Sequence, residues 1–323
     1  HEQSAAMAAE SYYRLINKIV VLNVTTGPGG INALNGVYGA YTDSLSMLVV
    51  SGQVKNETYL KNYKTNLRQL GDQEVDIVSM VKPITKYAVT VKDPREIKDI
   101  MDKAIYFLTN GRPGPVWIDV PIDVQGSLID PNELKGFDGN IKKLVNDPGV
   151  TGNTKLELTT KSNLNDKTFD IIFEKLKKSS RPVILAGTGV SISKMSKQFL
   201  KLIKKLKIPI VTGWNAHDLI SNDNEYYAGK PGTVGDRPGN FTVQNSDLLI
   251  VLGCRLNIRQ ISYNWKAFAP KAFKIMIDID QAELDKPTLK IDYKIKADLK
   301  NFIPIFIQKI QDVNYTCTKE HKK

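Results

Sequence analysis

Short apolar runs alternate with amphipathic stretches along the first part of the chain. The predicted elements are helices at Ala5–Leu15, Ile31–Tyr41 and Pro94–Leu108, and strands at Lys18–Val24, Ser46–Val50 and Val116–Val120. The strand segments are almost continuously apolar, which is typical of strands that helices cover on both faces of a parallel sheet. Glycine turns lie between a strand and the next helix, and this order predicts βαβ units.

The second part of the chain repeats this organisation. Its predicted strands are Pro182–Ala186, Ile208–Thr212, Leu248–Gly253 and Phe273–Ile279. Its predicted helices are Met195–Leu206 and Ala297–Ile310. Between the two parts, apolar periodicity gives way to Asn, Asp, Gly, Thr and Lys. We therefore predict an α/β fold with two open, mainly parallel, doubly wound sheets. The expected domains are residues 1–125 and 167–313, joined by a linker at 126–166 and followed by a polar tail at 314–323.

Composition places the chain among ordinary globular proteins. Of its 323 residues 41% are hydrophobic and 24% charged, enough to build two cores. No apolar run approaches the roughly 20 residues that cross a bilayer, and no signal peptide is recognisable. Cys254 and Cys317 are the only cysteines, which argues against a disulfide framework or a cysteine metal site. We expect a cytoplasmic protein with no membrane partner.

The net charge of +11 raises the question of nucleic-acid binding. Lysines are spread through helix-like stretches such as 175–178 and 201–207, where they would form solvated faces. Aromatic residues do not interleave with them as a base-stacking platform requires. We therefore predict no nucleic-acid partner.

Glu2 precedes a helix start built of small residues, Ser4 to Ala9. Small side chains let another surface approach closely, so we expect Glu2 at a crowded interface. Desolvation there would raise the pKa of its carboxyl and suit it to donate a proton. The alternative interpretation is a solvent-facing charge.

The segment Thr25 to Asn32 contains a glycine turn between a buried strand and a helix, a place where backbone N–H groups can meet a ligand. Its glycine spacing matches neither the Walker pattern nor the dinucleotide pattern. A tight strand-to-helix turn explains the glycines equally well.

Several short motifs follow one another through the first part of the chain. They are His1-Glu2-Gln3, Thr26-Gly27-Pro28-Gly29 with Asn32, Asp43-Ser44, Gly52-Gln53-Val54, Gln73-Glu74, Lys82-Pro83-Ile84-Thr85-Lys86 and Gly111-Arg112-Pro113-Gly114-Pro115-Val116, with Asp119 and Pro121 just after. As a series they resemble the pyrimidine-binding domain of acetolactate-synthase-type thiamine-diphosphate enzymes. The second block resembles the central domain of the same family. Its motifs are Gly187-Thr188-Gly189, Ser246-Asp247-Leu248, Gly253-Cys254-Arg255 and Asp278-Ile279-Asp280.

The resemblance implies an enzyme that decarboxylates a 2-oxo acid, pyruvate above all, and condenses it with a second one, as in branched-chain amino-acid synthesis. It implies thiamine diphosphate as cofactor and a homodimer or homotetramer. The glutamate matched by Glu2 hydrogen-bonds the aminopyrimidine ring, and Gln53 matches a second catalytic residue. The matches for cofactor binding are Glu2, Thr26, Gly27, Pro28, Gly29, Asn32 and Gln73, and Lys86 is a candidate substrate contact.

The same resemblance predicts where further cofactors would bind. Central domains of acetolactate synthases hold FAD, and Arg255, Arg259 and Asp278 are the candidate contacts here. The Mg²⁺ ligands of the family belong to a C-terminal diphosphate-binding domain that we do not recognise in this sequence. We therefore expect a fragment with no metal ligands, inactive as an isolated chain.

Two alternatives remain open. The segment Tyr59–Leu70 and the altered region Gly229–Asn240 favour considering a flavin-free thiamine-diphosphate decarboxylase, or a carboligase of a specialised pathway such as surface-sugar synthesis. A non-catalytic, truncated binding or scaffold protein would carry the same domains.

Overall fold

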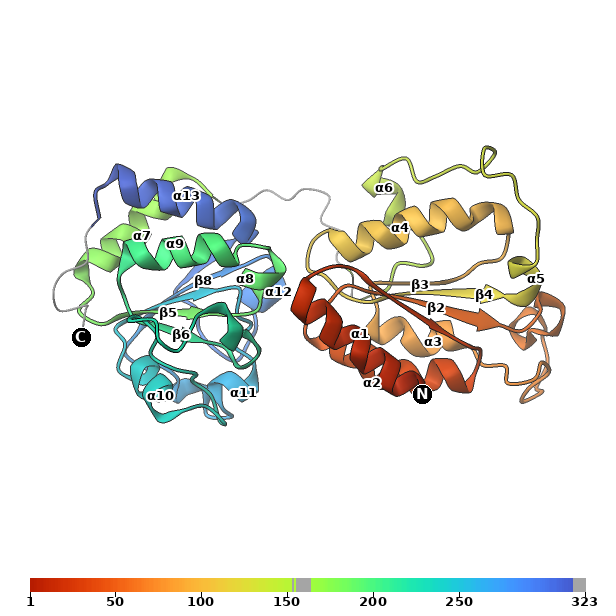
Figure 1. Cartoon of the computed structure of the whole chain (residues 1–323), viewed down its shortest axis with the longest axis horizontal. Helices are drawn as coiled ribbons and strands as arrows, with labels where there is room; N and C mark the ends of the chain where they lie inside the picture. The colour runs from red at the N-terminus through yellow and green to blue at the C-terminus, as the bar shows by residue number, and fades with distance from the viewer. Residues whose placement is uncertain (153, 155–163, 316–323) are drawn as a thin grey trace. The chain divides into compact units, whose positions relative to one another are not determined.

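The computed structural model describes residues 1–152, 154 and 164–315 and divides the chain into two compact units, residues 1–160 and 161–323 (Figure 1). The predicted tail beyond residue 315, with Cys317, and much of the predicted linker lie outside the described residues. Within the described residues, each unit contains one sheet, and every strand pair of both sheets is parallel. The predicted fold class is confirmed.

The first unit contains a four-stranded sheet in the order β1-β2-β4-β3. Its strands are β1 (Val20–Val24), β2 (Met47–Gln53), β3 (Tyr87–Thr90) and β4 (Val116–Pro121). Its helices are α1 (Glu2–Ile16), α2 (Pro28–Thr42), α3 (Ile77–Val81), α4 (Ile97–Thr109), α5 (Ile122–Gln125) and α6 (Ile141–Leu144). Single 3-10 turns lie at Asn56–Thr58, Leu60–Asn62, Lys82–Ile84 and Pro94–Glu96.

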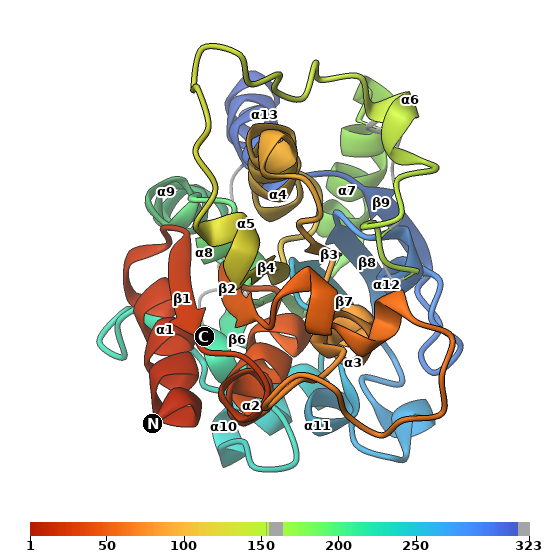
Figure 2. The same cartoon turned by 90° about the vertical axis from the view of Figure 1, so that its right-hand side faces the viewer.

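Helices cover both faces of this sheet, which explains its nearly continuous apolar strands. Figure 2 shows α4 on one side of the strands and α1, α2 and α3 on the other. Alternate residues of β4 separate accordingly, with Trp117 packed on the α1–α3 side and Val116 and Ile118 on the α4 side. All three side chains are 0–1% exposed. The sheet therefore has a hydrophobic core on each face.

The residues from 126 to 152, which the sequence assigns to a linker, pack against the first unit. Leu144 on α6 is fully buried, and the Thr151 hydroxyl donates to the Thr85 carbonyl. Val150 forms an isolated bridge with Tyr87 at the start of β3. Residues 126–152 therefore cover part of the sheet face on which α4 packs.

The second unit contains a five-stranded sheet in the order β6-β5-β7-β8-β9. Its strands are β5 (Pro182–Ala186), β6 (Ile210–Thr212), β7 (Leu248–Leu252), β8 (Phe273–Asp278) and β9 (Tyr293–Lys296). Its helices are α7 (Asp166–Lys178), α8 (Gly189–Ile192), α9 (Ser196–Leu206), α10 (Arg237–Gln244), α11 (Ile258–Ile261), α12 (Gln281–Leu284) and α13 (Leu299–Asp312), with 3-10 turns at Trp214–Leu219 and Trp265–Ala267.

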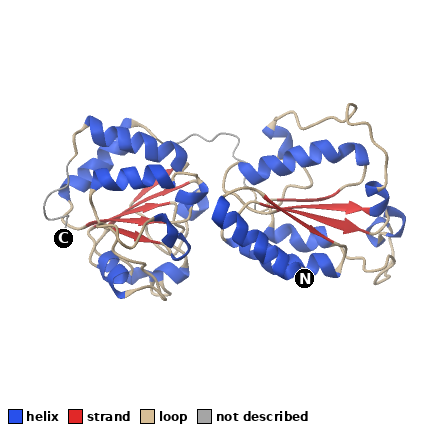
Figure 3. Ribbon diagram, viewed as in Figure 1, coloured by secondary structure: helices blue, strands red, loops and turns tan. Residues whose placement is uncertain are grey.

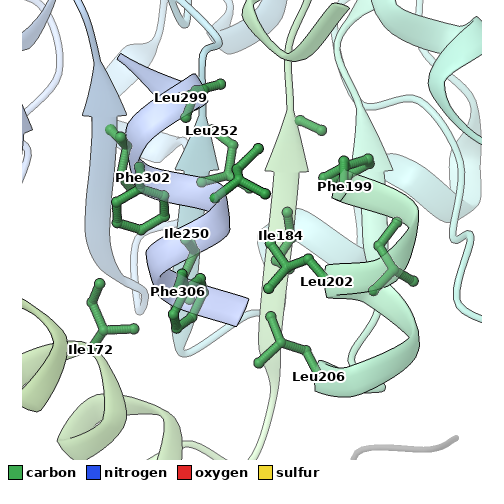
Figure 4. Packing of buried hydrophobic residues seen from close by; sticks show 14 of the residues in the cluster. Ile172, Ile184, Phe199, Leu202, Leu206, Ile250, Leu252, Leu299, Phe302 and Phe306 are labelled. Carbon is green, nitrogen blue, oxygen red and sulfur yellow. The ribbon is translucent and has the colours of Figure 1, made fainter. Parts of the chain in front are cut away.

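The larger core of the second unit lies between its sheet and helices α7, α9 and α13, which Figure 3 shows as a layer above the strands. Phe302 and Phe306 of α13, Phe199 of α9 and Ile250 of β7 are fully buried there (Figure 4). Helices α10, α11 and α12 pack on the opposite face. No helix in the described part of the chain is long and apolar enough to span a membrane.

Candidate functional site

The turn that joins β1 to α2 is fixed by Gly27, whose φ of +56° and ψ of −112° lie outside the range of most L residues. A side-chain carbon at this position would lie 2.0 Å from the carbonyl oxygen of Gln73. Gln73 itself has a left-handed φ of 59° and an exposed side chain. The Gly27 turn and the loop that carries Gln73 therefore touch backbone to backbone, and only glycine permits that contact.

Glu2, at the start of α1, lies beside the first turn of α2. The Asn32 side-chain nitrogen donates a 3.2 Å hydrogen bond to Glu2 Oε2. A side-chain carbon on Gly29 would lie 2.7 Å from Thr25 Cγ2 and, at ordinary contact distance, 3.6 Å from Glu2 Oε1, so Gly29 stands directly beside the carboxylate. The structure thus brings together three residues that the sequence predicts at one site.

The small residues of α1 explain how Glu2 reaches this place. Ala6 is fully buried against α2, and a side-chain carbon on Gly36 would lie 2.6 Å from its carbonyl carbon. The small-residue helix start therefore serves the close packing of α1 on α2. This packing fixes Glu2 over the turn that begins at Gly27.

The expected rise in the pKa of Glu2 does not occur in this chain. Its own backbone N–H and then the Asn32 side chain hold the pKa of Glu2 below its ordinary value. The side chain is partly exposed, so desolvation is too weak to reverse these two hydrogen bonds. The prediction of a raised pKa was wrong because it assumed a covering surface that this chain does not itself provide.

Gln53 ends β2 and is almost fully buried, at 3% exposed. Its amide nitrogen donates to the Val75 carbonyl at 2.9 Å and to Asp119 Oδ2 at 3.1 Å. Its amide oxygen accepts from the Thr26 hydroxyl at 3.2 Å and from the Val54 N–H at 3.0 Å. These bonds use both N–H groups and both lone pairs of the amide. Gln53 therefore ties the Thr26 turn and the Val75 loop to the sheet.

Asp119 is a residue whose role the sequence reasoning missed. It is fully buried in β4, where Ser51 on β2 and Thr90 on β3 stand opposite it in register. The Ser51 hydroxyl donates to Oδ1 at 2.6 Å and the Thr90 hydroxyl to Oδ2 at 3.2 Å. A single acidic residue inside an otherwise apolar strand was the available signal, because a buried charge requires partners.

Comparison with known proteins identifies both units. The N-terminal cofactor-binding domain of thiamine pyrophosphate enzymes matches residues 1–80, and the central domain of the same enzymes matches residues 169–305. The chain belongs to the thiamine pyrophosphate enzyme family.

Relatives named acetolactate synthase large subunit share about a third of the sequence. The probable large subunit of Methanocaldococcus jannaschii is 34% identical over 306 residues, which cover 94% of this chain and 47% of the relative. The probable large subunit of Methanococcus aeolicus is 32% identical over 323 residues, covering 100% and 50%. The large subunit of Lactococcus lactis is 33% identical over 308 residues, covering 95% and 49%. The chain spans about half the length of these relatives.

Most of the predicted residues of this thiamine pyrophosphate enzyme chain meet at one edge of the first sheet. Glu2, Gly29 and Asn32 form one group at the start of α2, where Pro28 is the first residue of the helix. Thr26 and Gln53 are hydrogen-bonded beneath the turn, and Gly27 contacts Gln73. This edge holds the carboxyl ends of the strands, where parallel sheets place their ligand sites.

Lys86 lies away from this group. It precedes β3 and therefore stands at the opposite edge of the sheet from Gln53, which ends β2. Its ammonium donates to the carbonyl oxygens of Phe107 at 2.5 Å and Asn110 at 2.8 Å, at the end of α4. Burial, with a smaller contribution from Arg112, lowers the pKa of Lys86 to about 7. In this structure the lysine stabilises a helix end.

The three candidate FAD contacts lie on the second unit. Arg255 follows β7 and Asp278 ends β8, so both stand at the carboxyl edge of neighbouring strands, and Arg259 is exposed on α11. Arg255 lies 3.9 Å from Glu283, and Asp278 accepts from the backbone of Asp280. The guanidinium groups suit a dinucleotide phosphate in charge.

The glycines of the neighbouring turn have an internal explanation. A side-chain carbon on Gly187 would lie 2.2 Å from the Gly253 carbonyl oxygen, and one on Gly189 would lie 2.8 Å from Gly253 Cα. Close packing of these two turns accounts for both glycines without a ligand. Among the described residues, no cluster of three or more His, Cys, Asp and Glu side chains could hold a metal ion.

Proposed function

We propose that this chain supplies the residue that activates thiamine diphosphate, Glu2, to an enzyme of the acetolactate synthase type. The observation that carries this proposal is the position of the Glu2 carboxylate, hydrogen-bonded to Asn32 and in contact with Gly29 at the start of α2. A carboxyl at this place can bind a ring nitrogen of the aminopyrimidine. Next to it, Thr26 is partly exposed and Pro28 exposed, so the turn could meet the cofactor at these two residues.

The residues present fit the cofactor. Bound thiamine diphosphate would supply an electron sink for the negative charge left when a 2-oxo acid loses CO₂. Glu2 would hold a proton at the pyrimidine, and Asn32 would orient the Glu2 carboxylate. Thr26, Gly27, Pro28, Gly29 and Gln73 would shape the wall against which the ring lies. Gln53 would support this wall rather than contact the cofactor, because its amide makes all of its hydrogen bonds within the protein.

Pyruvate is the proposed first substrate, and a second 2-oxo acid is the proposed acceptor. The names of the relatives support this choice over the two alternatives, because all three are named as acetolactate synthase large subunits, two of them as probable ones. We place the reaction in branched-chain amino-acid synthesis and the enzyme in the cytoplasm. Lys86 has no place in the proposed site, because its ammonium binds the end of α4.

FAD and Mg²⁺ are proposed as further ligands. FAD would lie at the carboxyl edge of the second sheet, held through its phosphates by Arg255 and Arg259, with Asp278 nearby. A flavin absorbance band that remains with the purified enzyme and falls in an Arg259→Ala variant would support this. Mg²⁺ would accompany the diphosphate of the cofactor, through oxygen ligands outside the residues described above.

A homodimer or homotetramer is the proposed assembly. Apolar side chains of the first two helices face solvent, with Leu15 84% exposed, Tyr12 54% and Tyr38 57%. A second copy of the chain would cover such a surface. Light scattering should give a multiple of the protomer mass, and a Leu15→Glu substitution should reduce it.

The test of the proposed function is pyruvate turnover by the complete enzyme that contains this chain, with thiamine diphosphate and Mg²⁺. Glu2→Gln keeps the shape of the side chain and removes its acid, so we expect a rate loss of about 10²-fold or more. Glu174→Gln is the matched control, because Glu174 is an exposed carboxylate on α7 paired with Lys178. Equal turnover in the two variants would exclude the assigned role of Glu2.

A further inference from the structure

Asp119 has three hydrogen-bond donors around it and no contact with solvent. Its side chain is fully buried, and its two oxygens accept from Ser51, Thr90 and Gln53. The Trp117 ring N–H in turn donates to the Ser51 hydroxyl at 2.8 Å, which leaves the Ser51 hydrogen directed at Asp119. An ionised carboxylate only accepts, so this arrangement of donors suits the charged form.

The direction of the Gln53 amide follows from this arrangement. Its nitrogen faces two acceptors, the Asp119 carboxylate and the Val75 carbonyl. Its oxygen faces two donors, the Thr26 hydroxyl and the Val54 N–H. A flipped amide would face donor to donor and acceptor to acceptor at all four contacts. These four bonds fix one orientation of the Gln53 amide, and Asp119 is the only charged group among the four partners.

Two loops of the proposed cofactor site depend on that orientation. Through its oxygen Gln53 holds Thr26, the residue before Gly27, and through its nitrogen it holds Val75, two residues after Gln73. Gly27 and Gln73 are the residues whose backbones touch. Loss of the Gln53 orientation would release both loops together.

We propose that Asp119 is a positioning residue, whose carboxylate orients Gln53 and thereby holds the Gly27 turn and the Gln73 loop in the form that receives the cofactor. This inference rests on the proposed function for its link to the cofactor. The link from Asp119 to the two loops stands on the hydrogen bonds alone.

Protonation of Asp119 would disturb the arrangement. Burial raises the pKa of Asp119 to about 6, while the bonds from Ser51, Gln53 and Thr90 oppose the rise and Asp76 adds to it. Tyr59 is the other ionisable group near it, and Lys61 is paired with Asp76. A protonated carboxyl carries a fourth hydrogen among three donors, so the Ser51 or Thr90 hydroxyl must turn to accept it, and the bond from Gln53 loses its charged acceptor and weakens. Acidification below about pH 6 should therefore loosen the two loops.

Global unfolding does not produce the same signal through this residue. Because the pKa is higher in the folded chain than its ordinary value, the folded state binds the proton more tightly than the unfolded chain. Between about pH 6 and pH 4, this group stabilises the fold as the pH falls. Faster local exchange in that range would therefore be a property of the loops.

The experiment is amide hydrogen exchange of this chain at pH 7.5 and pH 5.0, corrected for the intrinsic pH dependence of exchange. For residues 25–30 and 73–76 we expect about a tenfold acceleration at pH 5.0, as for one lost buried hydrogen bond. Asp119→Asn cannot ionise and should show no such pH dependence. Asp119→Ala should accelerate both segments at pH 7.5.

Asp123→Asn is the matched control, because Asp123 binds Asn56 on the same unit and is not among the hydrogen-bond partners of Gln53. It should behave like the wild type. The same pH dependence in Asp119→Asn, or unchanged exchange in Asp119→Ala, would overturn the proposal. Should Asp119→Ala fail to fold, the pH comparison in Asp119→Asn still decides the matter. Neither exchange measurement requires cofactor. Their outcome is therefore independent of the turnover experiment with Glu2→Gln.

The link to the cofactor is tested in the complete enzyme. The apparent dissociation constant of thiamine diphosphate should rise about tenfold in wild type between pH 7.5 and pH 5.0, in step with the exchange. In Asp119→Asn this rise should be absent. An affinity that follows the same pH curve in both proteins would contradict a positioning role for Asp119.

Discussion

The carbonyl oxygen of Gln73 occupies the place that a side chain on Gly27 would need, 2.0 Å from its first carbon. Two loops separated by some 45 residues of sequence thus meet without a side chain between them. The contact brings Gln73 to the turn that leads into α2. It also makes Gly27 the most constrained glycine of the proposed site, by space and by its φ of +56°.

Substitution of Gly27 by Ala should therefore destabilise the first unit. The backbone conformation alone costs about 1–3 kcal/mol for a residue with a side chain, and displacement of the Gln73 carbonyl adds to it. Urea unfolding of the chain would measure the loss. Gly152→Ala is the control, since a side-chain carbon there meets nothing within 4 Å. A Gly27→Ala variant as stable as Gly152→Ala would contradict the contact.

Asn32 should set the acidity of Glu2. Its side chain donates to Glu2 Oε2, and this bond is one of the two that lower the pKa of the carboxyl. In Asn32→Ala the charged carboxylate loses a hydrogen bond that stabilises it. The pKa of Glu2 should therefore move up toward its ordinary value. The titration can be followed by NMR of Glu2. An unchanged pKa would show that Asn32 does not bind the carboxylate in solution.

Lys86 predicts a pH dependence of stability. Its pKa of about 7 lies below the ordinary 10.5, so between these values the unfolded chain binds more protons than the folded one. The contribution of Lys86 to stability should therefore increase as the pH rises from 7 toward 10, by up to about 1.4 kcal/mol per pH unit.

The comparison that isolates this contribution is wild type against Lys86→Met. Met retains the apolar length of the side chain and cannot titrate, so the stability of wild type relative to Lys86→Met should grow between pH 7 and pH 9.5. Urea unfolding at both pH values measures the difference. A constant difference would mean that the ammonium is hydrated and titrates normally.

The sequence contained enough information to predict the sheets and half of the site. Apolar runs such as Val116–Val120 and Leu248–Gly253 are typical of strands covered on both faces, and both lie in parallel sheets. The motif residues Glu2, Gly29 and Asn32 were expected together and are together. The resemblance of their motifs to one enzyme family, rather than apolar periodicity, was what placed these residues at one site.

Other features depend on long-range partners that no local pattern encodes. Leu144 sits in a polar stretch assigned to a linker, yet its side chain is fully buried against the first sheet. Lys86 was a candidate substrate contact, and its partners are carbonyls more than 20 residues away. The hydrogen bonds of Gln53 and Asp119 join strands far apart in sequence. Each of these required the strand order and register, which apolar periodicity does not reveal.

The central claim is that the Glu2 carboxylate activates the cofactor, and the most direct measurement isolates that act from substrate. The rate of hydrogen–deuterium exchange at the reactive thiazolium carbon of bound thiamine diphosphate would be followed by NMR in the complete enzyme, for wild type and Glu2→Gln. The account predicts an exchange rate at least about 10²-fold slower in Glu2→Gln with the cofactor still bound. Equal exchange rates in the two proteins would contradict it.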